Sequence, residues 1–195
     1  MSQRILILQG HPDNGTTHLC HALANRYRNG AEESGHDVRQ IDLATLEFPL
    51  LRSPQEWKES PLPTSLAAAQ QDIGWCRHLV LFFPLWLGDM PAMVKAFLEQ
   101  ALRPGFAFEY VEGNPLGRKG LTGRSARVVV TMGMPAPIYR HLYRAHSVKS
   151  LERNILGFVG MSPVRETLIG SVETMSDATR DKWFRKLHVL GAEAR

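Results

Sequence analysis

Three short, mainly apolar runs stand out along the chain, at residues 5–8 (ILIL), 78–84 (HLVLFFP) and 126–132 (ARVVVTM). Runs that do not alternate are typical of strands buried on both faces of a parallel sheet. A more alternating segment at residues 36–43 predicts a partly exposed strand, and residues 163–170 predict a last one. The pattern therefore predicts five strands, with the first of them in the centre of the sheet.

Apolar positions at helical spacing fill the segments between these strands. The first expected helix follows Thr16 or Thr17 as its capping residue and ends before Gly35. The other expected helices lie at about residues 65–77, 91–102, 147–158 and 177–194. Residues 44–65 and 104–123 are rich in proline and glycine and predict a surface excursion and a series of turns. Strands that alternate with helices favour one doubly wound α/β domain over residues 1–195, with helices on both faces of a parallel sheet in the flavodoxin-like order 2-1-3-4-5.

Composition narrows the class of protein. With 195 residues, 44% of them hydrophobic and 22% charged, the chain is typical of one soluble domain, and no apolar run approaches the roughly 18 residues of a membrane span. Cys20 and Cys76 lie far apart and outside any metal-ligand spacing, which predicts no metal site and favours free thiols in a reducing cytoplasm. The net charge of +4 is scattered, so the chain is not expected to bind nucleic acid.

The loop after the first strand carries candidate chemistry for an anion. A strand, a small polar loop and a helix start place backbone N–H groups and a positive helix dipole at the sheet edge, where a phosphate can bind. His11, Thr16 and Thr17 add donors at this point. The loop lacks the lysine of a phosphate-binding NTPase loop and the G-x-G-x-x-G of a dinucleotide fold, so neither of those classes is supported.

The predicted strand order brings three loops together. In the 2-1-3-4-5 order, the loops after the first, third and fourth strands surround one crevice at the switch point of the sheet. These loops are residues 10–17, 84–90 and 131–139. We therefore expect a ligand site at this edge.

Four segments resemble the NAD(P)H:quinone oxidoreductases of the DT-diaphorase and modulator-of-drug-activity type. They are GHPDNGTTHL at residues 10–19, FFPLWLGDMPAMVKAFLEQAL at 82–102, GFAFEY at 105–110 and TMGMPAPIY at 131–139. The resemblance covers nearly the whole chain and implies a flavin-binding flavodoxin-like domain. It implies flavin contacts from His11, Thr16, Thr17 and His18 at the phosphate and from Pro84, Leu85, Trp86, Leu87, Gly88, Thr131, Met132, Gly133, Met134 and Tyr139 at the ring.

The resemblance also implies catalytic roles for Tyr139 and His146, which would handle charge on a flavin or quinone oxygen. His146 matches the family's histidine only with a one-residue shift in spacing, and His141 competes with it. Two further departures concern the ring site. Leu87-Gly88 stands where the family has Trp-Phe, and methionines at positions 132 and 134 stand where it has a threonine and a glycine.

The expected activity is hydride transfer from NAD(P)H to a bound flavin and then to a quinone or similar aromatic acceptor. The histidine-containing first loop resembles the branch of the family that binds FAD, so FAD is expected, with FMN as the alternative. The family's sites are completed by a second subunit, and the exposed aromatic residues of Phe48 to Trp57 and Phe106 to Tyr110 suit a homodimer interface.

Three alternatives remain open from the sequence. The chain resembles flavin-bearing regulatory subunits that attach peripherally to membrane transporters, which bind flavin but turn over slowly. A one-electron flavodoxin-type carrier is a second alternative, although such carriers are strongly acidic and this chain is basic, with a pI near 9.3. A flavodoxin-like domain without flavin is the third.

Overall fold

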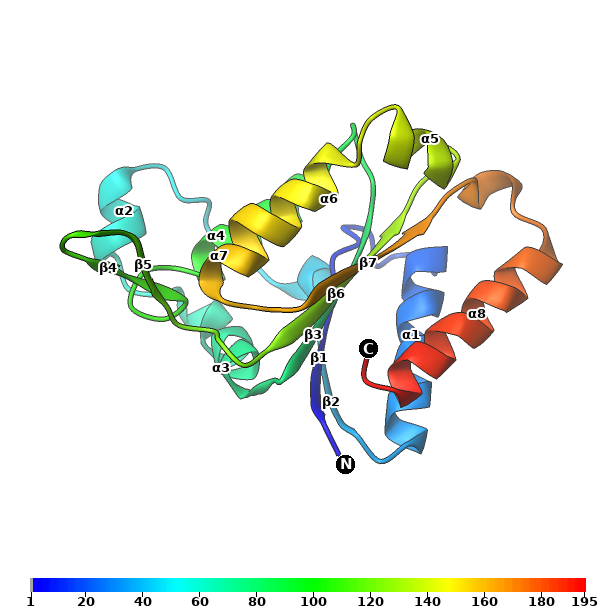
Figure 1. Cartoon of the computed structure of the whole chain (residues 1–195), viewed down its shortest axis with the longest axis horizontal. Helices are drawn as coiled ribbons and strands as arrows, with labels where there is room; N and C mark the ends of the chain where they lie inside the picture. Colours follow the sequence, from blue (N-terminus) through cyan, green and yellow to red (C-terminus); the bar gives the residue numbers. More distant parts are fainter. Residues whose placement is uncertain (1) are drawn as a thin grey trace.

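The computed structural model describes residues 2–195 and contains a central sheet of five parallel strands, in the order β2-β1-β3-β6-β7. Figure 1 shows this sheet running through the middle of the molecule. The strands are β1 (Arg4–Gln9), β2 (Asp37–Asp42), β3 (His78–Pro84), β6 (Ser125–Thr131) and β7 (Val164–Ile169). The predicted fold class and strand order are confirmed, since the five strands occupy positions 2-1-3-4-5 in chain order.

The three apolar runs form the buried centre of the sheet. Every residue of β3 is buried, as are five of the six residues of β1 and six of the seven residues of β6. β2 is largely exposed because it lies at one edge and pairs only with β1 among the described strands. The absence of alternation in the sequence therefore reports burial on both faces, as expected for a parallel sheet.

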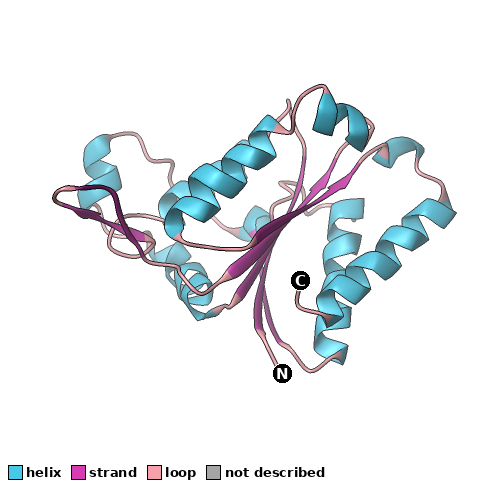
Figure 2. Cartoon of the chain, viewed as in Figure 1, coloured by secondary structure: helices cyan, strands magenta, loops and turns pink. Residues whose placement is uncertain are grey.

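Helices cover both faces of the sheet, as Figure 2 shows. α1 (Leu19–Glu33) and α8 (Asp177–Ala192) pack on one face, where Leu23, Tyr27 and Leu187 meet the side chains of Ile5, Ile7, Val80 and Val129. The other face is covered by α3 (Ala67–Trp75), α4 (Ala92–Ala101) and a helical segment that runs through α6 (His146–Ser150), the π-helical η3 (Leu151–Leu156) and α7 (Gly157–Val159). Two cores therefore sandwich the sheet.

Three elements differ from the sequence prediction. The glycine-rich residues 104–123, expected to be turns, contain an antiparallel hairpin of β4 (Phe108–Val111) and β5 (Asn114–Lys119) that projects from the body in Figure 1. The excursion at residues 44–65 contains the short helix α2 (Pro54–Glu59), which the Ser53 hydroxyl caps by accepting from the Glu56 N–H at 3.1 Å. The stretch before residue 147 contains α5 (Ala136–His141). These elements are short, and a helical or alternating pattern of apolar residues is hard to recognise over so few positions.

The excursion is fixed to the body by two buried polar side chains. Arg103, which follows α4, donates to the carbonyl oxygens of Glu56, Ser60 and Pro61, each at 2.8 Å. Gln100 donates to the carbonyl of Pro49 at 2.7 Å. The excursion is thus an ordered part of the domain although it has little regular structure.

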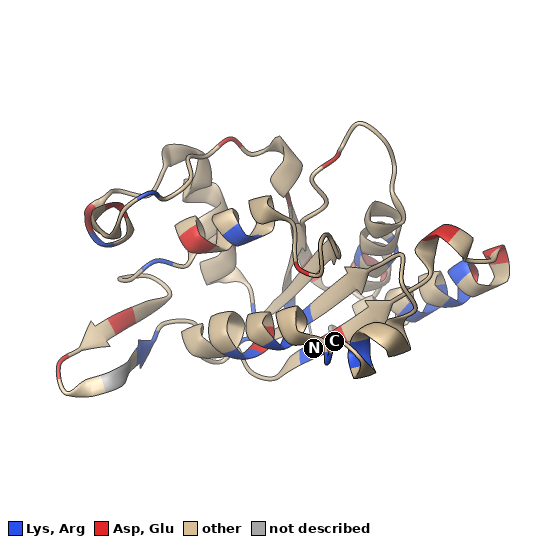
Figure 3. Cartoon of the chain, turned by 90° about the horizontal axis from the view of Figure 1, so that it is seen from above, with Lys and Arg blue, Asp and Glu red and all other residues tan. Residues whose placement is uncertain are grey.

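The surface gives no sign of a membrane span or of a single charged patch. Within residues 2–195, no helix is both long enough and apolar enough to cross a bilayer. Figure 3 shows basic and acidic segments interspersed along the elements.

Candidate flavin site

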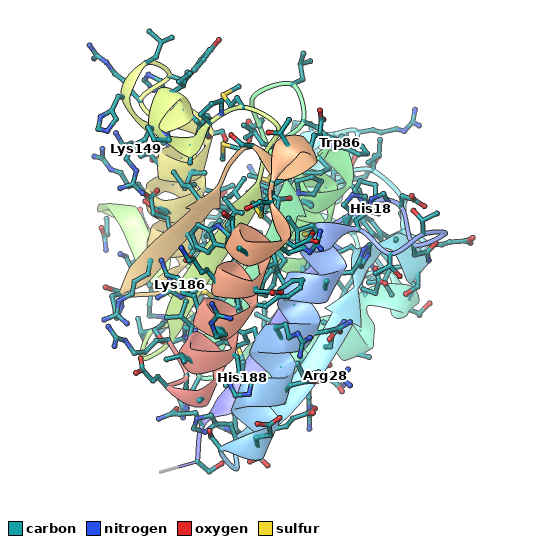
Figure 4. All side chains as sticks on the ribbon, turned by 90° about the vertical axis from the view of Figure 1, so that its right-hand side faces the viewer. His18, Arg28, Trp86, Lys149, Lys186 and His188 are labelled. Atoms are coloured by element: carbon teal, nitrogen blue, oxygen red, sulfur yellow. The ribbon has the colours of Figure 1, made fainter. Side chains whose placement is uncertain are left out.

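A cavity of about 230 Å³ lies at the carboxyl ends of the central strands. Its walls come from the loops after β1, β3, β6 and β7, so the three loops that the strand order was expected to bring together do meet there. The lining residues are His11, His18, Leu19, Cys20, Pro84, Leu85, Trp86, Thr131, Met132, Gly133, Val172 and Glu173. Figure 4 shows His18 and Trp86 at the same end of the molecule, near the start of α1.

The first loop is ordered around the carboxylate of Asp13. One carboxylate oxygen lies 2.6 Å from Nε2 of His18, and the other accepts from the Gly15 N–H at 2.8 Å. The hydrogen bond to His18, followed by that from Gly15, lowers the pKa of Asp13 to about 2. His18 occupies the capping position of α1, so the expectation that Thr16 or Thr17 caps this helix is wrong. The Asp13 carboxylate holds residues 13–18 in a loop through its contacts with Gly15 and His18, so the helix begins only after His18.

Three imidazoles gather at the N-terminus of α1. The rings of His11 and His18 stack with centroids 3.8 Å apart, and the ring of His21 lies 5.1 Å from His11 and 5.7 Å from His18. Burial lowers the pKa of His11, and the neighbouring His18 lowers it further. Burial also lowers the pKa of His21, against an opposing effect of the Asp42 carboxylate. Both groups therefore favour the neutral form in the absence of an added anion.

Gln9 is a buried polar residue behind this loop that the sequence analysis missed. Its side-chain oxygen accepts from the His11 N–H at 3.1 Å and from the Cys20 thiol at 3.3 Å. Its Nε2 is buried and has no hydrogen-bond partner among the described residues. The sequence signal that could have identified this residue is a polar glutamine directly after the apolar run of the first strand. Burial raises the pKa of Cys20 to about 12, so this thiol stays protonated near the cavity.

The second loop contains a tight two-residue turn. Trp86 and Asp89 exchange backbone hydrogen bonds of 2.9 and 3.0 Å, and the intervening Leu87 and Gly88 have φ values of 48° and 82°. Two successive positive φ values are the mark of a type I′ turn, which glycine adopts readily and leucine does not. The Leu87 side chain is fully exposed at the apex, and neither Leu87 nor Gly88 lines the cavity. Trp86 does line it, with its ring edge-on to His11 at 6.0 Å.

The third loop presents an open backbone to the cavity. Thr131 and Met132 are buried at the end of β6, and Gly133 follows on the cavity wall. A Cβ atom on Gly133 would lie 3.4 Å from a carboxylate oxygen of Glu173, an acidic residue on η4 (Val172–Thr174) that the sequence analysis also missed. Glu173 follows the last strand, whose loop was not included among the three expected at the crevice.

Several predicted site residues lie outside this lining. Thr16 and Thr17 are exposed on the first loop, and Met134 is half-buried in the third loop, outside the cavity lining. Tyr139 is buried in α5, where its phenol oxygen lies 2.9 Å from the Ser147 hydroxyl, while His146 is exposed at the start of α6. The two residues predicted to be catalytic therefore sit on adjacent short helices beyond the cavity.

The residues present fit the requirements of a flavin at two places. An anionic group at the start of α1 would meet helix N–H groups and the imidazoles of His11 and His18, which line the cavity. A flat ring would meet Trp86 and the side-chain-free Gly133. Glu173 is the one carboxylate among the described residues that line the cavity.

Comparison with known proteins decides the family. A family model described as the flavodoxin-like fold matches residues 3–189. The chain belongs to the flavodoxin-like fold family. Within this family it is similar to an NAD(P)H:quinone oxidoreductase from Methanothermobacter marburgensis, with a TM-score of 0.83, 24% identity and full coverage of both chains.

Curated relatives of this flavodoxin-like chain include oxidoreductases. An uncharacterized NAD(P)H oxidoreductase of Haemophilus influenzae is 25% identical over 179 residues, which cover 90% of this chain and 87% of the relative. An FMN-dependent NADH:quinone oxidoreductase of Cereibacter sphaeroides is 28% identical over 167 residues, covering 84% of this chain and 76% of the relative.

Proposed function

We propose that this flavodoxin-like protein is a flavin-dependent NAD(P)H oxidoreductase that passes a hydride to a quinone or similar aromatic acceptor. The observation that carries the proposal is the cavity in which the loops after β1, β3 and β6 meet, with imidazoles at one end and Trp86 and Gly133 at the other. Both curated relatives described above are named as oxidoreductases of NAD(P)H or NADH, and one of them is named as an NADH:quinone oxidoreductase.

FMN is the flavin we propose. The quinone oxidoreductase of Cereibacter sphaeroides is named for FMN, whereas the expectation of FAD rested on the resemblance of the first loop. When bound, the flavin supplies the hydride-transfer chemistry. The phosphate end of the flavin is proposed to be held by His11, Thr16, Thr17 and His18. The ring is proposed to lie against the loops at residues 84–88 and 131–134.

Tyr139 and His146 stay our candidates for handling the proton that accompanies hydride transfer. The Tyr139 phenol is held by Ser147 at 2.9 Å, which fixes its position on α5. His146, at the start of the next helix, is exposed and therefore free to exchange protons with solvent. A positioned phenol and a solvent-exposed imidazole are each suited to general acid–base roles.

A homodimer is proposed to complete the site. The cavity of about 230 Å³ is smaller than the roughly 300–1,000 Å³ of pockets that enclose a ligand, so one chain covers part of a flavin and its substrate. A separate apolar groove brings together the two aromatic segments predicted to form the interface. In it, the Trp57 indole N–H donates to the Tyr110 hydroxyl at 3.4 Å, and Tyr110 is 67% exposed. A second copy would cover these aromatic surfaces.

We also propose a cytoplasmic location. Cys20 and Cys76 are both free and buried, which suits a reducing compartment.

The proposal is tested by identifying the flavin and following turnover. The protein is purified, its cofactor is released and identified as FMN or FAD, and NADH or NADPH oxidation is then measured with menadione as acceptor. Release of FMN and turnover that depends on the quinone are expected. A preparation that holds no flavin and cannot be reconstituted with FMN or FAD would overturn the proposal. Tight flavin binding without turnover would instead favour the regulatory-subunit alternative.

A further inference from the structure

We propose that His11, His18 and His21 form a proton-linked phosphate site, which takes up about one proton when the phosphate end of the flavin binds. This inference rests on the proposed function and deepens it, because it states how charge is balanced at that site. It concerns the chain's own imidazoles and predicts that flavin retention depends on pH.

The geometry places three titratable rings within reach of one another. The centroid separations of 3.8, 5.1 and 5.7 Å put each imidazole next to the other two. Within the described part of the chain, no group of histidine, cysteine and acidic residues is arranged to hold a metal ion. The cluster lies at the start of α1, where an anion can accept from several N–H groups.

A backbone hydrogen bond sets the tautomer of one of these rings. The His18 N–H donates to Nδ1 of His21 at 3.3 Å, so the proton of the neutral His21 ring is on Nε2, which is buried without a partner among the described residues. Nδ1 of His11 lies 3.1 Å from the carbonyl oxygen and 3.2 Å from the N–H of Asp13, so it can donate to the first or accept from the second. His11 and His18 line the cavity, where their rings can meet an oxyanion, and the His21 ring lies beside both.

The charges around the cluster favour proton uptake. No lysine or arginine is among the described residues that line the cavity. The facing acidic groups are Asp13, bonded to His18, Asp42 at the end of β2 near His21, and Glu173 on the opposite wall; Cys20 is a neutral thiol. A phosphate monoester brings a charge of about −1.5 to −2 at neutral pH. Imidazoles are the groups here that can become positive to balance it.

The direction of the pH dependence follows from linkage. Burial and mutual repulsion lower the pKa of His11 and His21, so protons leave these rings readily while the site holds no anion. A bound phosphate favours the imidazolium form and raises the same pKa values. The affinity for a phosphorylated flavin must then rise as pH falls through the raised values, by up to about tenfold per pH unit for each proton taken up.

Comparison of FMN with riboflavin tests this inference, because the two ligands differ only in the phosphate. Dissociation constants are measured by flavin fluorescence between about pH 6.5 and 8.5, above the second pKa of a phosphate ester. The FMN affinity should increase several-fold per unit as pH falls, while riboflavin affinity stays flat. Calorimetry of FMN binding in two buffers of different ionisation enthalpy should report net proton uptake near neutral pH.

Two variants distinguish proton uptake by the imidazoles from proton uptake by the phosphate of the ligand. His21→Gln keeps an acceptor for the His18 N–H but removes one titrating ring, and it should reduce both the pH slope and the proton uptake. His141→Gln changes an exposed histidine on α5 and should leave both unchanged. Riboflavin binding by each variant shows that the ring site remains folded, and His18→Gln gives a second test if His21→Gln loses that binding.

The outcomes distinguish the inference from the function on which it rests. FMN binding that is as independent of pH as riboflavin binding, or proton uptake that His21→Gln and His18→Gln leave intact, would overturn the inference while leaving the oxidoreductase proposal standing. Failure of wild-type protein to bind either flavin would overturn both.

Discussion

The phenol oxygen of Tyr139 lies 2.9 Å from the hydroxyl oxygen of Ser147, across the short turn that joins α5 to α6. The bond holds a buried phenol on one helix against the first turn of the next, where His146 is exposed. The turn itself is tight, because Arg144 and Ala145 both have positive φ. A change in Ser147 would therefore move the phenol without removing it.

We predict that Tyr139→Phe slows reduction of the bound flavin by NADH about 10²-fold, since loss of a general acid or base typically has an effect of this size. His146→Gln should have an effect in the same direction. Both variants should retain flavin, because neither residue lines the cavity. Stopped-flow absorbance measures the rate. Tyr143→Phe, at an exposed tyrosine two residues after α5, is the matched control, and wild-type rates in both Tyr139→Phe and His146→Gln would remove the catalytic assignment.

Arg103→Ala should release the excursion at residues 44–65. Arg103 is 6% exposed, and its loss leaves the carbonyls of Glu56, Ser60 and Pro61 without their donor. A cost of about 3 kcal/mol in the free energy of unfolding is expected. Urea denaturation measures this cost, and limited proteolysis should show new cleavage near α2. Arg118→Ala, at an exposed ion pair with Glu109, should cost less than about 1 kcal/mol. Equal costs for the two variants would contradict the assignment.

Gly10→Ala should damage the start of the first loop. A Cβ atom at residue 10 would lie 2.7 Å from a methyl of Val94 and 2.9 Å from the Phe82 carbonyl oxygen. The overlap should destabilise the protein by about 1–3 kcal/mol and weaken FMN binding through displacement of His11. Gly74→Ala in α3 is the control, because its nearest contact is 3.5 Å and alanine is the better helix former. A Gly10→Ala protein as stable as Gly74→Ala would show that the backbone there is not constrained.

Acid should destabilise the protein through His78. This residue is 3% exposed at the start of β3, and burial, with Arg127 and Arg165 nearby, lowers its pKa from 6.5 to about 4. The unfolded chain takes up the proton first, so stability is constant above about pH 6.5, falls between about 6.5 and 4, and then levels off. The loss at this residue is on the order of 3 kcal/mol. Denaturation midpoints across this range should change less in His78→Gln, and an unchanged profile would contradict the prediction.

The sequence predicted those parts of the fold in which one local pattern extends over many residues. The apolar runs identified β1, β3 and β6, and the strand order followed from the alternation with helices. The β4–β5 hairpin was missed because its strands are short and its glycines indicate turns equally well. α2 and α5 were missed because each spans six residues, less than two helical turns.

The candidate site was predicted at the level of loops better than at the level of side chains. Loops after β1, β3 and β6 meet because the topology requires it. Whether a given side chain faces the cavity depends on local backbone geometry, and the positive φ at Leu87 exposes that side chain at a turn apex. Glu173 and His21 were missed because their roles arise from packing between elements and not from any motif.

The proposed activity is tested most directly by following the visible flavin absorption band of the FMN-loaded protein in the absence of oxygen, first on addition of NADH or NADPH and then of menadione. The account predicts that the nicotinamide bleaches the band and that the quinone restores it, with both half-reactions fast enough to support steady-state turnover. A bound flavin that neither nicotinamide reduces, or a reduced flavin that the quinone leaves unchanged, would contradict it.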